Sequence, residues 1–413
     1  MRRRLITGLT IAALATAGCS GVGGGGSDGP VEITFSHWAL TAPPFDSFTD
    51  VMDQFNASQD AYIVKPENIP YKNYHRTVYT QAGAGEGPTM ISVDSSELAQ
   101  AVDSGLAEDI TADIKLPAGL SQYEQSLDVD GSRHAVTFTR HPYAMLVNTA
   151  MLDEIGADIP ETFEEFTQIA EKWTDAPDTY GFAFRHTTAD TNGWWLDLSN
   201  WIHGSGGYWS DESGPTLDTP EVAEGISRMK TFLDEGTIPE GTDAPTYRRL
   251  FWEGKIPILF ESLAFAGIFA AQSEDLAKSI EVRKEPFPDN SYVSSNNPVF
   301  VNASASDEEK KGAVEFLNYM LSDDVQQEMV DNLAGSLVSS DLEFSEATFE
   351  NNPWLRGWEA ENSGLDFTPP GVGAEFQRFR EAILDQMERI FADEVSVEEG
   401  LAQAQKDAEE TLK

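Results

Sequence analysis

The chain has 413 residues and a formal net charge of −43, because 70 aspartates and glutamates outnumber 27 lysines and arginines. This acidic excess argues against nucleic acid as a partner, since phosphate binding needs clustered Lys and Arg, and it opposes adsorption to anionic lipid surfaces. A single cysteine excludes an internal disulfide, a cysteine-based zinc site and a CxxC redox pair. The length predicts two or three compact units, and the charge indicates a salt-rich habitat, where screening weakens self-repulsion.

The N-terminus has the pattern of an export signal. Three arginines follow the initial methionine, residues 5–17 carry no charge, and Gly18-Cys19-Ser20 comes next. This order gives a basic segment, an apolar segment and a small-residue cleavage site. The apolar segment is too short to span a bilayer, so we interpret it as a signal sequence.

The position of the cysteine suggests lipidation. Ala17-Gly18-Cys19 resembles the lipobox of bacterial and archaeal lipoproteins, with Thr16 where the lipobox prefers Leu. The alternative is a plain secretory signal with an incidental cysteine. We expect residues 1–18 to be a signal peptide, Cys19 to carry lipid, and residues 19–30 to form a flexible, glycine-rich tether. The protein would then be extracytoplasmic, anchored to the outer face of the cell membrane.

From residue 31 onward, strand and helix signals alternate. Apolar residues at period two predict strands, and apolar residues at three- and four-residue spacing predict helices. The expected elements are strands at 31–35, 62–64 and 89–93 and helices at 45–55, 71–82 and 97–104. This alternation predicts a mostly parallel sheet with helices on both faces.

The alternating pattern then restarts. The expected elements are strands at 135–139, 144–147, 180–184, 256–260 and within 292–301, and helices beginning near 162, 219 and 306. Arg140-His141-Pro142 separates the first two of these strands, because proline interrupts a hydrogen-bonded ladder. The last hundred residues are expected to be helical. The chain is therefore predicted to form two α/β lobes with a helical C-terminal region.

Five local patterns occur in an order and at a spacing that match one known family. They are Gly87-Pro88-Thr89-Met-Ile, Ser104-Gly-Leu-Ala-Glu-Asp109, the stretch from Leu146 to Phe166, Phe251-x-x-Gly254-Lys255-x-Pro-Ile, and Glu309-x-x-x-Ala313-x-Glu-Phe316-Leu. These patterns resemble the extracellular solute-binding proteins of ABC importers, in the branch that binds sugars and oligosaccharides. Thr89, Val147 and Phe163 depart from the Asp, Tyr and Trp that the family usually has at these places.

The resemblance implies a two-lobe fold of the periplasmic-binding-protein type, in which hinge-linked, doubly wound α/β lobes close on a ligand like a Venus flytrap. By this alignment, residues 31–141 plus 298–336 form the N-terminal lobe, and residues 142–297 plus 337–413 form the C-terminal lobe. The chain is expected to cross between the lobes near residues 139–143, 296–299 and 333–339.

The resemblance also implies the function. It indicates a substrate-binding lipoprotein that captures a sugar or oligosaccharide and delivers it to the permease of an ABC transporter, as a monomer without enzymatic activity, cofactor or metal. Two alternatives stay open: a binder of another solute such as a peptide, and a surface glycan-processing enzyme. No G-x-x-x-x-G-K-[ST] loop occurs, so the chain is not the transporter's ATPase, and no HExxH is present.

A sugar site needs aromatic rings for the C–H faces of the sugar and polar groups for its hydroxyls. Trp38 directly follows the first strand, where ligands bind in open α/β sheets, and is our first stacking candidate, with core packing as the alternative. Asp94 follows the third strand. We expect its carboxylate to accept from the ligand, while Ser95 or Ser96 caps the following helix, because Ser-x-x-Glu is also a cap signature. Ser96 is a further ligand candidate.

The remaining candidates come from the hinge and the second lobe. Trp194 and Trp195 are adjacent on an expected helix and so cannot face the same way; we expect at least one to face the ligand or solvent, although both could be core residues. Arg140 is a ligand candidate or half of a surface ion pair, and Trp354 is a stacking or a core residue. The other candidates are Tyr143, Glu261, Asn297, and Phe265, which stands where the family commonly has Trp.

Overall fold

The structure is a computed structural model of the chain. It describes residues 29–41, 45–125, 127–129, 131–174, 178–289, 291, 293–333, 335–358, 365–366 and 369–413. The predicted signal peptide, Cys19 and the predicted tether up to residue 28 lie outside the described residues.

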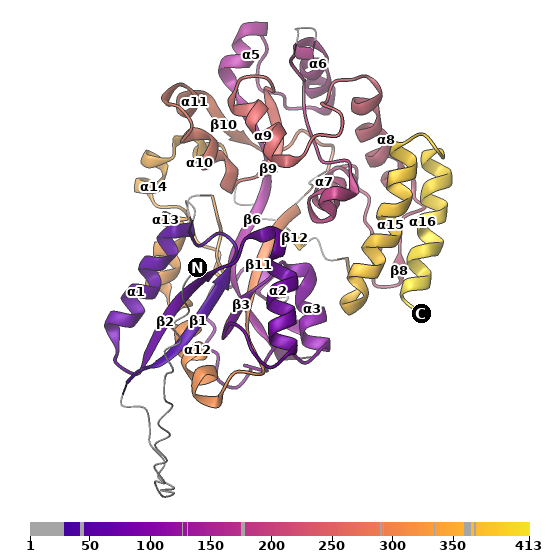
Figure 1. Cartoon of the computed structure of the whole chain (residues 1–413). Coiled ribbons are helices and arrows are strands. Elements are labelled where there is room, and N and C mark those ends of the chain that lie inside the picture. Colours follow the sequence, from indigo (N-terminus) through magenta and orange to yellow (C-terminus); the bar gives the residue numbers. More distant parts are fainter. Residues whose placement is uncertain are drawn as a thin grey trace, which may run out of the picture.

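Three parallel strands form one end of the main sheet (Figure 1). β1 (Val31–His37) lies between β2 (Tyr62–Asn68) and β3 (Met90–Ser92). Helices α1 (Phe48–Ser58) and α12 (Asp307–Met320) pack on one face, because their apolar residues share a core with Ile33 and Phe35. Helices α2 (Tyr71–Gly83) and α3 (Ser95–Asp103) pack on the other face. We call this part the first lobe.

A single long strand, β6 (Ala135–Asn148), leads out of the first lobe. The predicted break at Arg140-His141-Pro142 is therefore wrong. Pro142 lies where β6 exchanges one neighbouring strand for another: it is opposite Ser294, and the next residue, Tyr143, is opposite Ser262. A residue without an N–H group is tolerated at such a point.

The second lobe is built around the far half of β6. β9 (Ile258–Ser262) and β10 (Ile280–Arg283) both pair antiparallel with it. Alternate residues of β6 enter different cores, with Ala144 and Leu146 on one face and Met145 and Val147 on the other. The apolar segment predicted as a strand at 180–184 is not one, because its backbone bonds to loops: Tyr180 donates to the carbonyl of Lys255, and Gly181 to that of Thr237.

The three predicted crossing segments lie side by side. β11 (Val293–Val301) runs antiparallel to both β6 and β3, with an irregularity between Asn297 and Pro298. Arg140 of β6 is opposite Asn296 of β11, and its backbone exchanges two hydrogen bonds of 2.8 Å with Leu337. The exact division of the chain into lobes at residues 141, 297 and 336 remains a prediction.

The C-terminal helices form a hairpin at the side of the second lobe (Figure 1). Helix α15 (Phe376–Phe391) packs against α16 (Val397–Thr411), and its apolar residues recur at helical spacing on the buried face. Helix α7 (Thr191–Gly204) is buried on every side from Gly193 to Gly204, because α8 (Pro220–Asp234), α15 and the sheet surround it.

The remaining elements connect or edge these parts. They are η1 (Phe45–Ser47), α4 (Gln122–Gln125), β4 (Asp128–Val129), β5 (Ser132–Arg133), α5 (Thr149–Ile155), α6 (Phe163–Thr174), η2 (Thr188–Asp190), β7 (Ser210–Asp211), β8 (Gly214–Pro215), α9 (Ala244–Trp252), α10 (Ala264–Ala270), α11 (Glu274–Ser279), α13 (Asp323–Asn332), α14 (Glu346–Asn351), η3 (Pro353–Gly357), β12 (Leu365–Asp366) and η5 (Gly373–Glu375).

Candidate functional site

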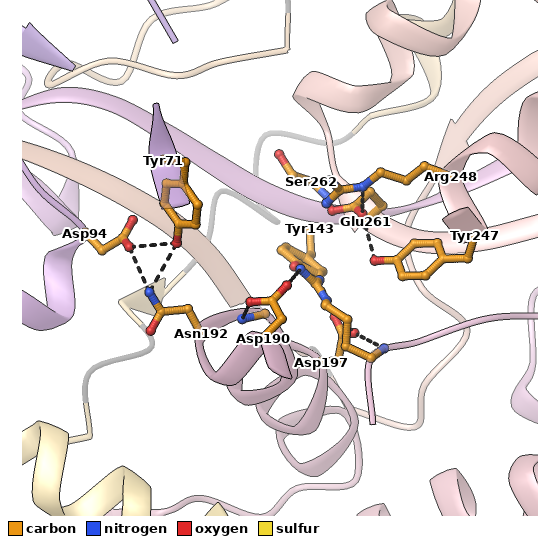
Figure 2. A network of polar contacts seen from close by, with 12 residues as sticks. Tyr71, Asp94, Tyr143, Asp190, Asn192, Asp197, Tyr247, Arg248, Glu261 and Ser262 are labelled. Carbon is orange, nitrogen blue, oxygen red and sulfur yellow. Dashed lines mark hydrogen bonds and ion pairs between the residues drawn. The ribbon is translucent and has the colours of Figure 1, made fainter. Parts of the chain in front are cut away.

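The carboxylate of Asp94 lies at the junction of the two lobes (Figure 2). It follows β3, at the carboxyl end of the parallel strands. Three donors converge on it: the amide of Asn297 at 3.3 Å, the amide of Asn192 at 3.1 Å and the hydroxyl of Tyr71 at 3.3 Å. Two of the predicted ligand residues, Asp94 and Asn297, are thus brought together, and Asn192 of the second lobe joins them.

The predicted capping of α3 is wrong. The helix begins at Ser95, and Asp94 rather than Ser95 or Ser96 is its N-cap residue. The side chain of Asp94 makes no capping hydrogen bond, so its carboxylate is free to face the second lobe. The hydroxyl of Ser96 is buried and has no hydrogen-bond partner among the described residues. Such an unpartnered group is a natural contact for a water molecule or a solute.

His75 forms a charged cluster with two carboxylates of the first lobe. Its ring nitrogens contact Glu97 and, at 3.4 Å, Asp94. Burial alone would lower the pKa of His75, but the hydrogen bonds and charges of Asp94 and Glu97 outweigh burial and raise it to about 10. The imidazole is therefore an imidazolium at neutral pH.

We expect the contribution of His75 to stability to be lost progressively as the pH rises from 6.5 to about 10. Because the pKa is higher in the folded protein than the ordinary 6.5, the stabilisation is complete below pH 6.5 and is lost as the pH rises through about 10. The rings of Trp38, Tyr71 and Tyr74 also face this imidazole, and His37 lies close enough to interact with it; none of them carries a negative charge at neutral pH, and burial lowers the pKa of His37 well below its usual value. Urea unfolding of wild type and His75→Gln should differ most near pH 6 and converge towards pH 10; a difference that grows with pH would contradict this assignment.

A buried ion pair lies in the second lobe next to β6. Arg185 binds Asp197 through both guanidinium and backbone nitrogens, at 2.6, 2.7 and 2.9 Å. Arg185 also donates to the hydroxyl of Tyr143 at 2.7 Å, which places this predicted ligand residue at the edge of the ion pair. Asp190 accepts from the backbone of Gly193 and caps the N-terminus of α7. Figure 2 shows Tyr143, Asp190 and Asp197 beside the Asp94 cluster.

Glu261, at the end of β9, belongs to a second ion pair. Its carboxylate accepts from Arg248 at 2.7 Å and from Tyr247 at 3.2 Å, as Figure 2 shows. The guanidinium of Arg248 lies 3.7 Å from the ring centre of Phe265, in cation–π contact. Phe265 is half-buried, so part of its ring is accessible.

Arg140 is held by protein partners at the hinge. Its Nε donates to the carbonyl of Val338 at 2.8 Å, and its guanidinium pairs with Asp341 at 3.1 Å. The ion-pair alternative therefore describes Arg140 better than the ligand role, although the side chain itself is buried rather than at the surface. Its contacts tie the first crossing segment to the third.

The structure divides the predicted tryptophans into two groups. Trp38 is half-buried, stacked on His37 with ring centres 4.1 Å apart, and keeps some accessible surface. The expectation that Trp194 or Trp195 faces the ligand or solvent is wrong, because α7 is covered on all sides: Trp195 stacks on Trp209 at 4.3 Å, and both rings are fully buried. Trp354 is also buried in a core.

Several residues at the junction were not among the sequence candidates. They are Tyr71, His75, Glu97, Arg185, Asn192, Asp197, Tyr247, Arg248 and Arg380. Arg185 follows the apolar segment 180–184, and Asn192 lies at the start of the helix that contains Trp194 and Trp195. For these two residues, a position next to a predicted element could have indicated a place in the site. The others lie within helices, where sequence position gives no comparable signal.

Two further observations concern the described residues alone. Among them, no helix combines the length and hydrophobicity that a membrane span requires. Within the same residues, no group of three or more His, Cys, Asp or Glu side chains has the arrangement of a metal site.

Comparison with known proteins identifies the family. The family model described as "Bacterial extracellular solute-binding protein" matches residues 50–354. A curated relative, Lipoprotein LipO of Bacillus subtilis (strain 168), is 24% identical over 259 residues; the match covers 58% of this chain, and the chain spans about half of that relative, 51%.

Solved structures match over nearly the whole chain. The cyclic alpha-maltosyl-1,6-maltose binding protein from Arthrobacter globiformis is 20% identical, covers 93% of this chain and 99% of its own, and has a TM-score of 0.77. Maltose-bound MalE3 of T. maritima is 19% identical, with coverages of 92% and 99% and a TM-score of 0.77. These likenesses confirm the predicted two-lobe α/β fold of periplasmic binding proteins. By the family match over most of its length, this chain belongs to the bacterial extracellular solute-binding proteins.

Proposed function

We propose that the protein captures a neutral carbohydrate between its two lobes and delivers it to the permease of an ABC transporter. The observation that carries the proposal is the electrostatic balance at the junction. Arg185 pairs with Asp197 and Arg248 with Glu261, while His75 lies against Asp94 and Glu97. A charged solute would have to compete with these internal pairs, which makes its desolvation costly.

The polar groups suit hydroxyls. Carboxylates and amides such as those of Asp94, Asn297 and Glu261 accept from or donate to sugar hydroxyls in fixed directions. Trp38 and Phe265 supply accessible ring surface at the same junction. Rings of this kind stack on the C–H faces of a sugar. We therefore place Trp38, Asp94, Ser96, Tyr143, Glu261, Phe265 and Asn297 in the proposed solute site, and leave out Arg140, Trp194, Trp195 and Trp354.

The transport role rests on the family and on the predicted N-terminus. The family is described as extracellular, and one curated relative is a lipoprotein; both support an extracytoplasmic location. We propose that lipid on Cys19 holds the protein at the outer face of the membrane and that the closed, solute-loaded form docks on the permease. Both lobes contact the solute together only in the closed form, so solute shifts the equilibrium towards closure by its differential affinity. No bond of the solute is made or broken.

A thermal-shift screen tests the proposal. The purified protein is heated with neutral mono- and oligosaccharides, short peptides and organic phosphates, and the incubated sugars are then analysed by chromatography. At a solute concentration of about 100 times Kd, binding adds about 2.7 kcal/mol to stability, so at least one neutral sugar should raise Tm clearly and be recovered intact. Stabilisation by peptides or phosphates alone would contradict the proposed substrate class, and release of a shortened sugar would indicate an enzyme.

A further inference from the structure

The side chain of Asn192 joins the two lobes directly. It stands at the start of α7 in the second lobe, and its amide nitrogen donates to Asp94 at 3.1 Å and to the Tyr71 hydroxyl at 3.2 Å. Both acceptors belong to the first lobe (Figure 2). The amide oxygen accepts from the guanidinium of Arg380, which comes from α15 in the second lobe. The amide nitrogen of Asn192 therefore binds the first lobe, while its amide oxygen binds the second lobe.

The chemistry of the neighbours fixes which way this amide points. A guanidinium only donates hydrogen bonds, and an ionised carboxylate only accepts them. The oxygen of Asn192 must therefore face Arg380 and the nitrogen must face Asp94. The reverse orientation would set donor against donor and acceptor against acceptor. A carboxylate at this position would still suit Arg380, but it would lie against the carboxylate of Asp94.

Arg380 adds charge to this contact. It is buried, and its Nε has no hydrogen-bond partner among the described residues. Helix α3 of the first lobe contacts both α15 and η5, so the C-terminal hairpin touches the first lobe here. Burial lowers the pKa of Arg380, and the negative charges of Glu97 and Asp94 counteract that effect. The cation of the second lobe thus faces the carboxylates of the first.

We propose that Asn192 and Arg380 form a latch with Tyr71 and Asp94 that favours closure of the lobes even when no solute is bound. Asn192 and Arg380 are positioning residues in this proposal: closure is partly a property of the chain, and solute adds to it. The effect of the latch on solute affinity rests on the proposed function, but its effect on closure does not. The helical hairpin at the C-terminus thereby contributes to opening and closing, although most of it packs within the second lobe.

Two substitutions test the latch. Asn192→Asp keeps the shape and the Arg380 contact but sets a second carboxylate against Asp94, and Arg380→Gln removes the positive charge. Small-angle X-ray scattering of the full protein in buffer without solute should give both variants a larger radius of gyration than wild type. Where a sugar binds wild type, both should bind it about tenfold more weakly, as expected for loss of one charged hydrogen bond.

Matched control variants distinguish loss of the latch from a general effect of changed net charge or of misfolding. Asn351→Asp adds the same negative charge at an exposed position, and Arg378→Gln removes the same positive charge from an exposed position of α15. Both controls should keep the wild-type radius, and circular dichroism should show all four variants folded. A radius unchanged in Asn192→Asp and Arg380→Gln, or equally enlarged in the controls, would overturn the latch. A wild type that is compact in buffer but binds no sugar would keep the latch and reject the proposed function.

Discussion

Replacing Asp197 by alanine is expected to lower the free energy of unfolding by about 3–5 kcal/mol, as is usual when one partner of a buried ion pair is removed. The carboxylate accepts three hydrogen bonds from Arg185, and both side chains are almost completely buried. Without it, the buried guanidinium would keep only weaker contacts among the described residues: the Tyr143 hydroxyl at 2.7 Å and the half-exposed carboxylate of Asp190 at 4.0 Å. Urea unfolding at neutral pH measures the change.

Two comparisons make this result specific. Glu253 pairs with Arg249 on the surface, so Glu253→Ala should change stability by about 0–1 kcal/mol. Replacing both buried partners, Arg185→Met with Asp197→Leu, should recover much of the loss, because no unpaired charge then remains inside. A double variant as unstable as Asp197→Ala would show that packing, rather than the unpaired charge, is the cause.

Trp38→Ala is expected to weaken binding of the sugar identified by the thermal-shift screen by about 100-fold, the size of effect seen when a central aromatic contact is removed. The ring is half-buried at the carboxyl end of β1, beside Tyr71 and His75 of the Asp94 cluster. Trp38→Phe keeps an aromatic surface and should keep most of the affinity. Titration calorimetry below the melting temperature of each variant gives the dissociation constants.

Tyr208 provides the control for this prediction. It is 49% exposed and packs against His203 of α7, away from the Asp94 cluster. Tyr208→Ala removes a similar exposed ring and should leave the affinity at the wild-type value. Equal affinities in Trp38→Ala and wild type would remove Trp38 from the proposed site.

Much of the fold could be predicted from local patterns, because those patterns agree with the tertiary structure. The expected helices near 162, 219 and 306 are present, and Thr162, Thr219 and Ser306 each accept a hydrogen bond from a backbone N–H of the first turn. The prediction of a strand at 180–184 is wrong because a buried apolar segment forms a strand only when a neighbouring strand pairs with it. The predicted break at Pro142 is wrong because β6 passes there from pairing with β11 to pairing with β9, and the residues of these strands lie more than 100 positions away in the sequence.

Site candidates could be predicted only at strand ends and in a crossing segment. Asp94 and Glu261 were proposed because they lie at strand ends, and Asn297 because it lies in a crossing segment; the structure brings Asp94 and Asn297 into contact, and their role as ligands stays a prediction. Asn192 and Arg380 are 188 positions apart and meet only through packing of α7 and α15, which no local pattern shows. Trp194 and Trp195 were misplaced for a related reason. Adjacent side chains on a helix point in two different directions, but both directions lead into the protein interior when, as in α7, other elements surround the helix.

The central claim is that a neutral sugar fills the junction, and one pair of titrations tests it most directly. Wild-type protein is titrated in a calorimeter with the neutral sugar that raises Tm most in the thermal-shift screen and with the same sugar carrying a phosphate group. The paired charges at the junction predict saturable binding of the neutral sugar and binding at least about tenfold weaker for the phosphorylated one, since His75, Arg185 and Arg248 already pair with carboxylates. Tighter binding of the phosphorylated sugar, or no binding of any neutral sugar, would contradict the account.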